Sequence, residues 1–149
     1  MNNTDCNVLL VDDHAVVRAG YRHLLETQGG FSQVREAENA QEAFAACQKE
    51  LPVLIICDIS MPEPVGLSLI QRVLGRWPDV KFLMFTMHNS IELARACMDA
   101  GAKGYVTKSS RPEVLLRAIG EVLAGRTFIS ADLSRLMALS RLRDNRGGL

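Results

Sequence analysis

Three aspartates end apolar runs of this sequence, and their carboxylates are the first candidates for chemistry. Asp12 and Asp13 follow the run Val8–Val11, and Asp58 follows the run Val53–Cys57. An unbroken apolar run of this length is typical of a strand buried on both faces in a parallel sheet. A carboxylate at the C-terminal end of such a strand lies where open α/β folds place their chemistry. We therefore take Asp58 as the candidate reacting group.

The pair Asp12–Asp13 has two interpretations. By itself it is explained equally well by a solvated turn or a helix cap and by a binding site. With Asp58 at the same edge of a sheet, three carboxylates would converge and repel one another unless a cation lay among them. A site built from oxygen ligands alone suits Mg²⁺. The three aspartates together therefore favour a magnesium site.

Two further side chains complete the predicted pocket. Thr86 ends the fourth apolar run and Lys108 follows the fifth. An ammonium group neutralises a phosphoryl oxygen, and a hydroxyl group donates a hydrogen bond to another. Each residue alone is unremarkable, because exposed lysines and threonines at strand ends are common. Their shared edge with the carboxylates predicts a pocket for a phosphoryl group.

The elements that position these residues alternate regularly along the chain. Apolar runs predict five strands, and segments of helical spacing that end at Gly or Pro separate them. The expected strands are residues 8–11, 33–37, 53–57, 80–85 and 105–107. Asn89, with Glu92 three residues later, predicts the start of the fourth helix, and Pro112 lies in the first turn of the fifth. This alternation predicts an α/β fold with a doubly wound parallel sheet.

Composition restricts the class of protein. The chain has 149 residues, of which 48% are hydrophobic, and a formal net charge of +0. One domain with its own core is expected, without an overall attraction to nucleic acid. Four cysteines without a CxxC pair, no signal peptide and no apolar run long enough to span a membrane predict a cytoplasmic protein.

The ordered set of site residues resembles the CheY-like receiver domain of two-component response regulators. The resemblance rests on Asp12-Asp13, Asp58 followed by Met61-Pro62 and Gly66, Thr86, Gly104-Tyr105-Val106 and Lys108, and it covers about residues 7–124. Val11-Asp12-Asp13-His14, residues 100–105 and Lys108-Ser109 resemble the NarL/FixJ (LuxR-type) branch in particular. The resemblance implies a flavodoxin-like, five-stranded sheet of order 2-1-3-4-5 with helices on both faces.

The resemblance also implies a role for each site residue. Asp58 would accept a phosphoryl group from a sensor histidine kinase, and Lys108 would pair first with Asp58 and then with the phosphoryl group. Asp12, Asp13, Asp58 and the backbone carbonyl of Ser60 would hold Mg²⁺. Thr86 and Tyr105 would be the switch residues, with readout by the face of the fourth helix, fifth strand and fifth helix.

The same resemblance predicts the organisation of the whole regulator. Residues 1–125 would be the receiver domain, and residues 126–149 a linker or helix leading to a helix-turn-helix output domain outside this chain. The chain would be a fragment of such a regulator or a receiver that stands alone. DNA would be bound only through that domain, and phosphorylation would favour a homodimer. We expect no contact with a membrane.

Several residues depart from the usual receiver pattern. Ser109 stands where proline in a cis peptide often follows the lysine, which leaves open whether the Lys108–Ser109 bond is cis or trans. Met87 is bulkier than the usual residue after Thr86 and would narrow access to the pocket. Glu63-Pro64 would stiffen the loop after Asp58.

Two other functions use the same residues less well. A Mg²⁺-dependent phosphatase using Asp58 as a nucleophile would need a further acid/base group and a substrate cap, and the sequence shows neither. A degenerate receiver that only binds partners would lack pocket residues, and none is missing. For His14, His23 and His88 the sequence favours a surface role, or one beside the site, over metal ligation.

Overall fold

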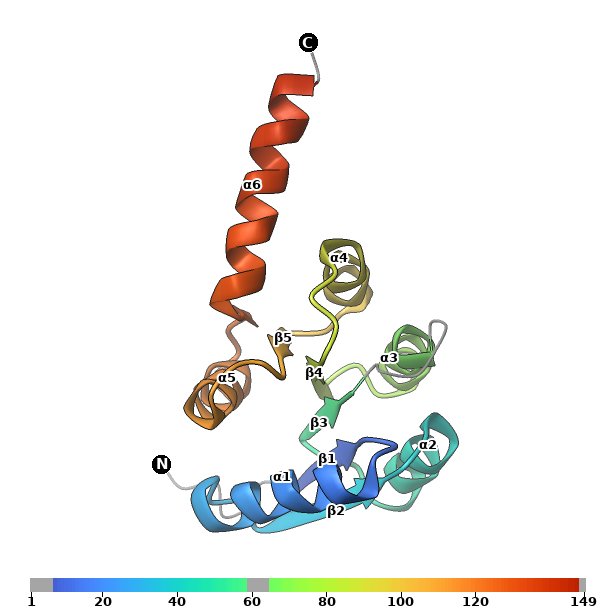
Figure 1. The fold of residues 1–149 in the computed structure, drawn as a ribbon. Coiled ribbons are helices and arrows are strands. Elements are labelled where there is room, and N and C mark those ends of the chain that lie inside the picture. The colour runs from blue at the N-terminus through green and yellow to red at the C-terminus, as the bar shows by residue number, and fades with distance from the viewer. Residues whose placement is uncertain (1–6, 59–64, 148–149) are drawn as a thin grey trace.

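A computed structural model describes residues 7–58 and 65–147 as a six-stranded parallel sheet with helices on both faces (Figure 1). The strands are β1 (Asn7–Val11), β2 (Gln33–Ala37), β3 (Leu54–Cys57), β4 (Lys81–Thr86), β5 (Gly104–Thr107) and β6 (Phe128–Ile129). The helices are α1 (Ala15–Gln28), α2 (Ala40–Lys49), α3 (Val65–Arg76), α4 (Ile91–Ala100), α5 (Pro112–Leu123) and α6 (Ala131–Gly147). The predicted doubly wound, flavodoxin-like class is confirmed.

The sheet separates two apolar clusters. One face packs against α2, α3 and α4, and the other packs against α1 and α5 (Figure 1). All four residues of β3 are buried, because this strand lies between β1 and β4 and has a helix layer on each side. The unbroken apolar run before Asp58 therefore has the expected physical cause.

The expected strand count of five is corrected to six. The order is β2-β1-β3-β4-β5-β6, so the expected order 2-1-3-4-5 is extended by one strand. Phe128 and Ile129 pair in parallel with Gly104 and Tyr105 of β5. A strand of two residues is too short to produce an alternating pattern, which is why no strand was expected here.

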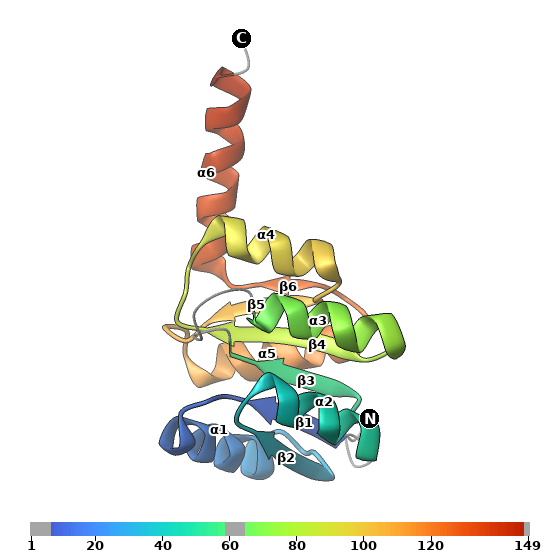
Figure 2. The same cartoon turned by 90° about the vertical axis from the view of Figure 1, so that its right-hand side faces the viewer.

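The C-terminal helix α6 is partly built into the core. Its residues Leu133 and Met137 are buried in the cluster that contains α4, whereas Leu139 and Leu142 further along are exposed. Figure 2 shows the helix rising past α4 and leaving the body of the domain. At the face expected to consist of α4, β5 and α5, β6 and the first turns of α6 therefore cover the edge of β5.

The start of α4 is also corrected. Ser90, not Asn89, is the N-cap, and its hydroxyl accepts a hydrogen bond from the backbone N–H of Leu93 at 3.2 Å. Both residues are good caps, and the helix begins one residue later than expected. The helix ends at Ala100, and Gly101 is the C-cap, where a φ of 118° favours glycine.

None of the helices in the described part of the chain is long and apolar enough to cross a membrane.

Candidate functional site

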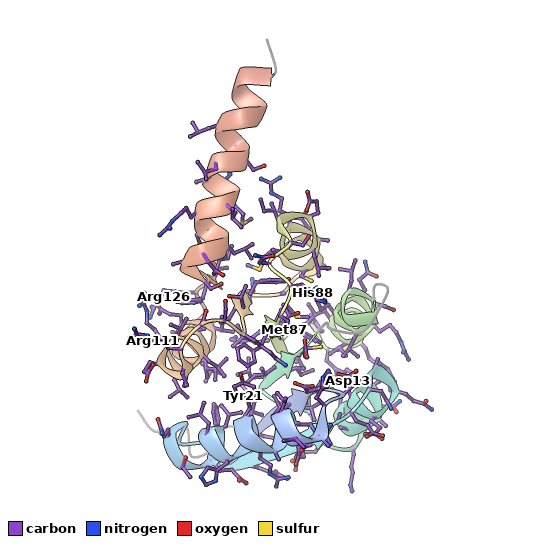
Figure 3. All side chains as sticks on the ribbon, in the orientation of Figure 1. Asp13, Tyr21, Met87, His88, Arg111 and Arg126 are labelled. Atoms are coloured by element: carbon purple, nitrogen blue, oxygen red, sulfur yellow. The ribbon has the colours of Figure 1, made fainter. Side chains whose placement is uncertain are left out.

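The ends of β1 and β3 bring the three predicted carboxylates together. Val11 and Cys57 are paired in the sheet, so Asp12 and Asp58 follow adjacent positions. Ligand atoms of Asp12, Asp13, Asp58 and His14 all lie within 4.8 Å of one another. The side chains of Asp12 and Asp58 are each 3% exposed, whereas that of Asp13 is 38% exposed. Figure 3 shows the side chains around this edge, with Asp13 labelled.

Lys108 bridges the two buried carboxylates. Its Nζ lies 2.8 Å from Asp12 Oδ2 and 2.8 Å from Asp58 Oδ2. Burial lowers the pKa of Lys108, but the hydrogen bonds to Asp12 and Asp58 outweigh it, so the pKa is raised above its ordinary value. The ammonium group is therefore charged at neutral pH and is held against the candidate reacting group.

The site carries more negative than positive charge. Three carboxylates and one ammonium group give a sum of −2 (three negative, one positive). Two of these carboxylates are almost fully buried, where unbalanced charge is costly. The oxygen donors, their spacing and this charge fit a hard divalent cation such as Mg²⁺.

Arg18 of α1 fixes the backbone at Asp12, a role that the sequence did not indicate. Its guanidinium donates hydrogen bonds to the Asp12 carbonyl and to Glu36 Oε1, the latter at 2.6 Å. The Asp12 N–H also donates to the Ala37 carbonyl at 3.0 Å. Helical spacing does not show which backbone group a long side chain reaches, so the sequence carried no signal for this contact.

A pocket of about 310 Å³ opens onto the candidate reacting group. It is lined by His14, Val17, Tyr21, Asp58, Met87 and Lys108. Met87 is 70% exposed and lies at the pocket wall, as Figure 3 allows the reader to follow. The Lys108 Nζ also lies 5.8 Å from the Tyr21 ring centre. Tyr21 and Val17 are pocket residues that the sequence did not identify.

The two predicted switch residues are linked through the backbone of His88. The His88 N–H donates to Thr86 Oγ1 at 3.2 Å, and the Tyr105 hydroxyl donates to the His88 carbonyl at 3.0 Å. Thr86 and Tyr105 are fully buried. Burial raises the pKa of Tyr105 well above its ordinary value, so the phenol remains a hydrogen-bond donor. The backbone of His88 is thus in contact with both side chains.

Other expectations about single residues have different outcomes. Ser60, Met61-Pro62 and Glu63-Pro64 lie outside the described residues. No cis peptide bond occurs within the described ranges, so the Lys108–Ser109 bond is trans.

The histidines lie in different surroundings. The Nδ1 of His14 is 3.0 Å from Asp13 Oδ1, which places this ring beside the acidic group, and the backbone of His88 joins the switch residues. His23 lies on the exposed part of α1. That none of them is a metal ligand stays a prediction.

Comparisons with known proteins agree with this geometry. Residues 8–120 match the family described as the response regulator receiver domain. The response regulator UvrY of Escherichia coli K12 is 38% identical over 136 residues, which cover 91% of this chain and 62% of UvrY. The transcriptional activator protein ExaE of Pseudomonas putida is 39% identical over 131 residues, which cover 88% of this chain and 61% of ExaE. The chain thus spans about three fifths of the length of these relatives.

Solved structures give the same result. The structure of a LuxR-family two-component response regulator from Aurantimonas sp. SI85-9A1 has a TM-score of 0.86 and 38% identity, and covers 91% of this chain and 97% of that one. The isolated receiver domain of RcsB from Salmonella enterica serovar Typhimurium, solved with the phosphomimetic BeF₃⁻, has a TM-score of 0.79 and 29% identity. It covers 88% of this chain and 97% of that one.

Proposed function

Because this chain belongs to the response-regulator receiver family, we propose that Asp58 is the phosphoacceptor of its two-component system. The observation that carries the proposal is the contact between Lys108 and Asp58 at 2.8 Å, at the wall of a pocket of about 310 Å³. A carboxylate in such a pocket can attack a phosphorus atom as a nucleophile. The ammonium group beside it offsets the negative charge of the incoming phosphoryl group.

The proposed reaction is a transfer from the phosphohistidine of a sensor histidine kinase. A carboxylate oxygen of Asp58 attacks the phosphorus atom, the P–N bond breaks, and its electron pair returns to the imidazole of the kinase. Lys108 then exchanges its contact with the Asp58 carboxylate for one with a phosphoryl oxygen, while its contact with Asp12 keeps the ammonium group in place.

Asp12, Asp13 and Asp58 are the residues proposed to hold Mg²⁺, with the Ser60 carbonyl as a further ligand outside the described residues. The bound ion would neutralise charge on the transferring phosphoryl group. The chemistry of the donors and the sum of −2 support this assignment.

Thr86 and Tyr105 are proposed to convert the new phosphoryl group into a change of surface. The Thr86 hydroxyl would donate a hydrogen bond to a phosphoryl oxygen, and the His88 N–H would then lose Thr86 Oγ1 as its acceptor. The His88 carbonyl holds the Tyr105 hydroxyl, so Tyr105 would respond at the face of α4, β5 and α5. A phosphoryl group supplies strong acceptors, which is sufficient to reorder such a segment.

The output of the whole protein is inferred from its relatives. The relatives are longer than this chain, and one solved structure shows a complex of the response regulator RcsB with DNA. We propose that residues 1–125 act as the receiver and that residues 126–149 lead to a helix-turn-helix domain that binds DNA. Phosphorylation would favour a homodimer.

Two finer points belong to the same proposal. The chain is a signalling domain, and its own catalysis is expected to be limited to assisting phosphoryl transfer and slow loss of its own phosphoryl group. Cys47, Cys57 and Cys97 are free thiols, which suits the reducing conditions of the cytoplasm.

Intact-mass measurement after incubation with acetyl phosphate and Mg²⁺ tests the proposal. We expect wild type to gain one phosphoryl group only when Mg²⁺ is present, and Asp58→Asn to gain none. Asp79→Asn removes an exposed carboxylate elsewhere and should behave as wild type. Wild type that forms neither this adduct nor a complex with beryllofluoride would contradict the proposal and favour a phosphorylation-independent binding module.

A further inference from the structure

The end of β5 sends neighbouring side chains in opposite directions. Lys108 reaches Asp12 and Asp58 in the pocket, and Thr107 reaches Asp132 in the first turn of α6. Successive side chains of an extended chain point to opposite sides, which explains this division. Two consecutive residues, Thr107 and Lys108, therefore contact the C-terminal helix and the proposed phosphoryl site, respectively.

The hydroxyl of Thr107 is the first link. Its Oγ1 lies 2.9 Å from Asp132 Oδ2 and 3.0 Å from Ser109 Oγ. A carboxylate only accepts hydrogen bonds, so Thr107 donates to Asp132, and the Ser109 hydroxyl donates to Thr107. Thr107 is 2% exposed, so water does not replace Asp132 at this hydroxyl without a rearrangement.

Ser130 supplies the second link. Its Oγ accepts the Thr107 backbone N–H at 3.3 Å, and its hydroxyl donates to Asp132. Its backbone N–H donates to the Tyr105 carbonyl at 3.0 Å. Partial burial raises the pKa of Asp132, but the hydrogen bonds from Ser130 and Thr107 outweigh it and hold the pKa below its ordinary value. Asp132 is thus an ionised acceptor for two buried hydroxyl groups.

These links enclose the turn that carries the lysine. The Ser110 N–H closes the turn 107–110 on the Thr107 carbonyl at 3.1 Å, and the Lys108 N–H donates to the Thr86 carbonyl at 2.7 Å. Asp132 binds the side of this turn opposite the pocket. A residue of α6 is thus hydrogen-bonded to the residue that directly precedes Lys108.

We propose that Asp132 is a positioning residue for Lys108, and that the contact between Thr107 and Asp132 couples the phosphoryl pocket to α6. The inference rests on the proposed function, because it requires the pocket to receive a phosphoryl group. Coupling between two sites acts in both directions. The first turns of α6 hold the lysine for reaction, and a phosphoryl group that draws Lys108 away from its contact with Asp58 changes the stability of those turns.

Thr107→Val is the main test variant, because valine has nearly the same shape and lacks the hydroxyl group. Thr107→Ser keeps the hydroxyl and is the conservative variant that should restore wild-type behaviour. Asp132→Ala removes the acceptor from the other side. Arg135→Ala changes an exposed residue of the same helix and serves as the matched control.

The first readout is the rate of phosphorylation by acetyl phosphate and Mg²⁺, followed by intact mass on the full chain. We expect Thr107→Val and Asp132→Ala each to react about fivefold more slowly, the lower end of typical coupling between sites. The double variant should be no slower than either single one, because both changes break the same link. Thr107→Ser and Arg135→Ala should react as wild type.

The second readout is amide hydrogen exchange in residues 131–137, with and without beryllofluoride and Mg²⁺. Wild type should show a change of exchange on binding, and Thr107→Val should show none. A merely structural role would raise exchange equally in both states and would leave that difference intact.

The outcomes separate the two proposals. Wild type that binds no beryllofluoride and gains no phosphoryl group overturns the proposed function and this inference with it. Wild type that is phosphorylated, but whose exchange in α6 is unaffected and whose variants react at the wild-type rate, overturns only the coupling through Asp132.

Discussion

Two groups of charged side chains lie close together around β1 and α1, and they differ in charge balance. The acidic pocket consists of Asp12, Asp13, Asp58 and Lys108, with a sum of −2. The arginine cluster consists of Arg18, Arg22, Glu26 and Glu36, with two charges of each sign. Asp58 and Lys108 of the acidic pocket line the cavity of about 310 Å³, whereas Glu36 of the arginine cluster lines a separate cavity together with Arg35, Lys49 and Glu50.

The difference in charge balance distinguishes a candidate reactive site from a group of ion pairs that supports the fold. In the arginine cluster each glutamate has an arginine partner, and Arg18 uses a remaining donor to hold the Asp12 carbonyl. In the acidic pocket one ammonium group serves two buried carboxylates. Balanced ion pairs stabilise a fold modestly, whereas an excess of buried charge beside a cavity is sustained where a ligand compensates it.

Removal of the Lys108 charge should have the largest effect, and the quantity affected is the free energy of unfolding. Lys108→Gln leaves two buried carboxylates without their cation, so the free energy of unfolding in metal-free buffer should fall by about 3 kcal/mol. Added Mg²⁺ should raise the free energy of unfolding of the variant by more than it raises that of wild type. Urea denaturation with EDTA and with Mg²⁺ measures both effects.

Arg22→Gln is the matched control in the arginine cluster. It removes one cation from a 41% exposed position, so it should cost no more than about 0.5 kcal/mol and be insensitive to Mg²⁺. Equal losses in the two variants would show that the charge balance does not distinguish the two groups.

Removal of one carboxylate should have an intermediate effect. Asp13→Asn takes away a ligand of the proposed magnesium site, and the affinity for a divalent cation should fall at least about tenfold. Calorimetric titration with Mg²⁺, and with Mn²⁺ as a second probe, measures it. Glu26→Gln removes a similarly exposed carboxylate from the arginine cluster and should leave the affinity unchanged. A loss shared by both variants would point to a general charge effect.

Removal of the Glu36 charge should have a smaller effect than either change in the acidic pocket. Its hydrogen bond from Arg22 lowers the pKa of Glu36 against the opposing effect of burial, with Arg18 adding to the lowering. A carboxyl group with a lowered pKa stabilises the fold above its ordinary pKa, and this stabilisation is lost as the pH falls through the folded-state pKa. Glu36→Gln should therefore cost about 1 kcal/mol at neutral pH and progressively less in acid.

Urea denaturation of both chains, near neutral pH and below the ordinary carboxyl pKa of 4.5, measures this difference. A deficit of the variant that is constant with pH would show that the contribution of Glu36 does not depend on its charge.

The strand ends were predictable because their signals are local. Apolar runs that stop at a carboxylate, a hydroxyl or a lysine placed Asp12, Asp58, Thr86 and Lys108 at one edge, and the parallel sheet brings them there. Ser90 as the cap of α4 was missed because Asn89 beside it has the same capping chemistry.

The sequence by itself determined the layers of the fold and which side chains meet at the sheet edge. Parallel strands all present their C-terminal ends to one side, so this result needs no knowledge of packing. The tertiary structure decided the contacts between long or distant partners: Arg18 with the Asp12 carbonyl, Tyr21 beside Lys108, and Thr107 with Asp132. These contacts depend on how a helix sits on the sheet and on a two-residue strand, β6, that places the start of α6. Periodicity along the chain carries no information about either.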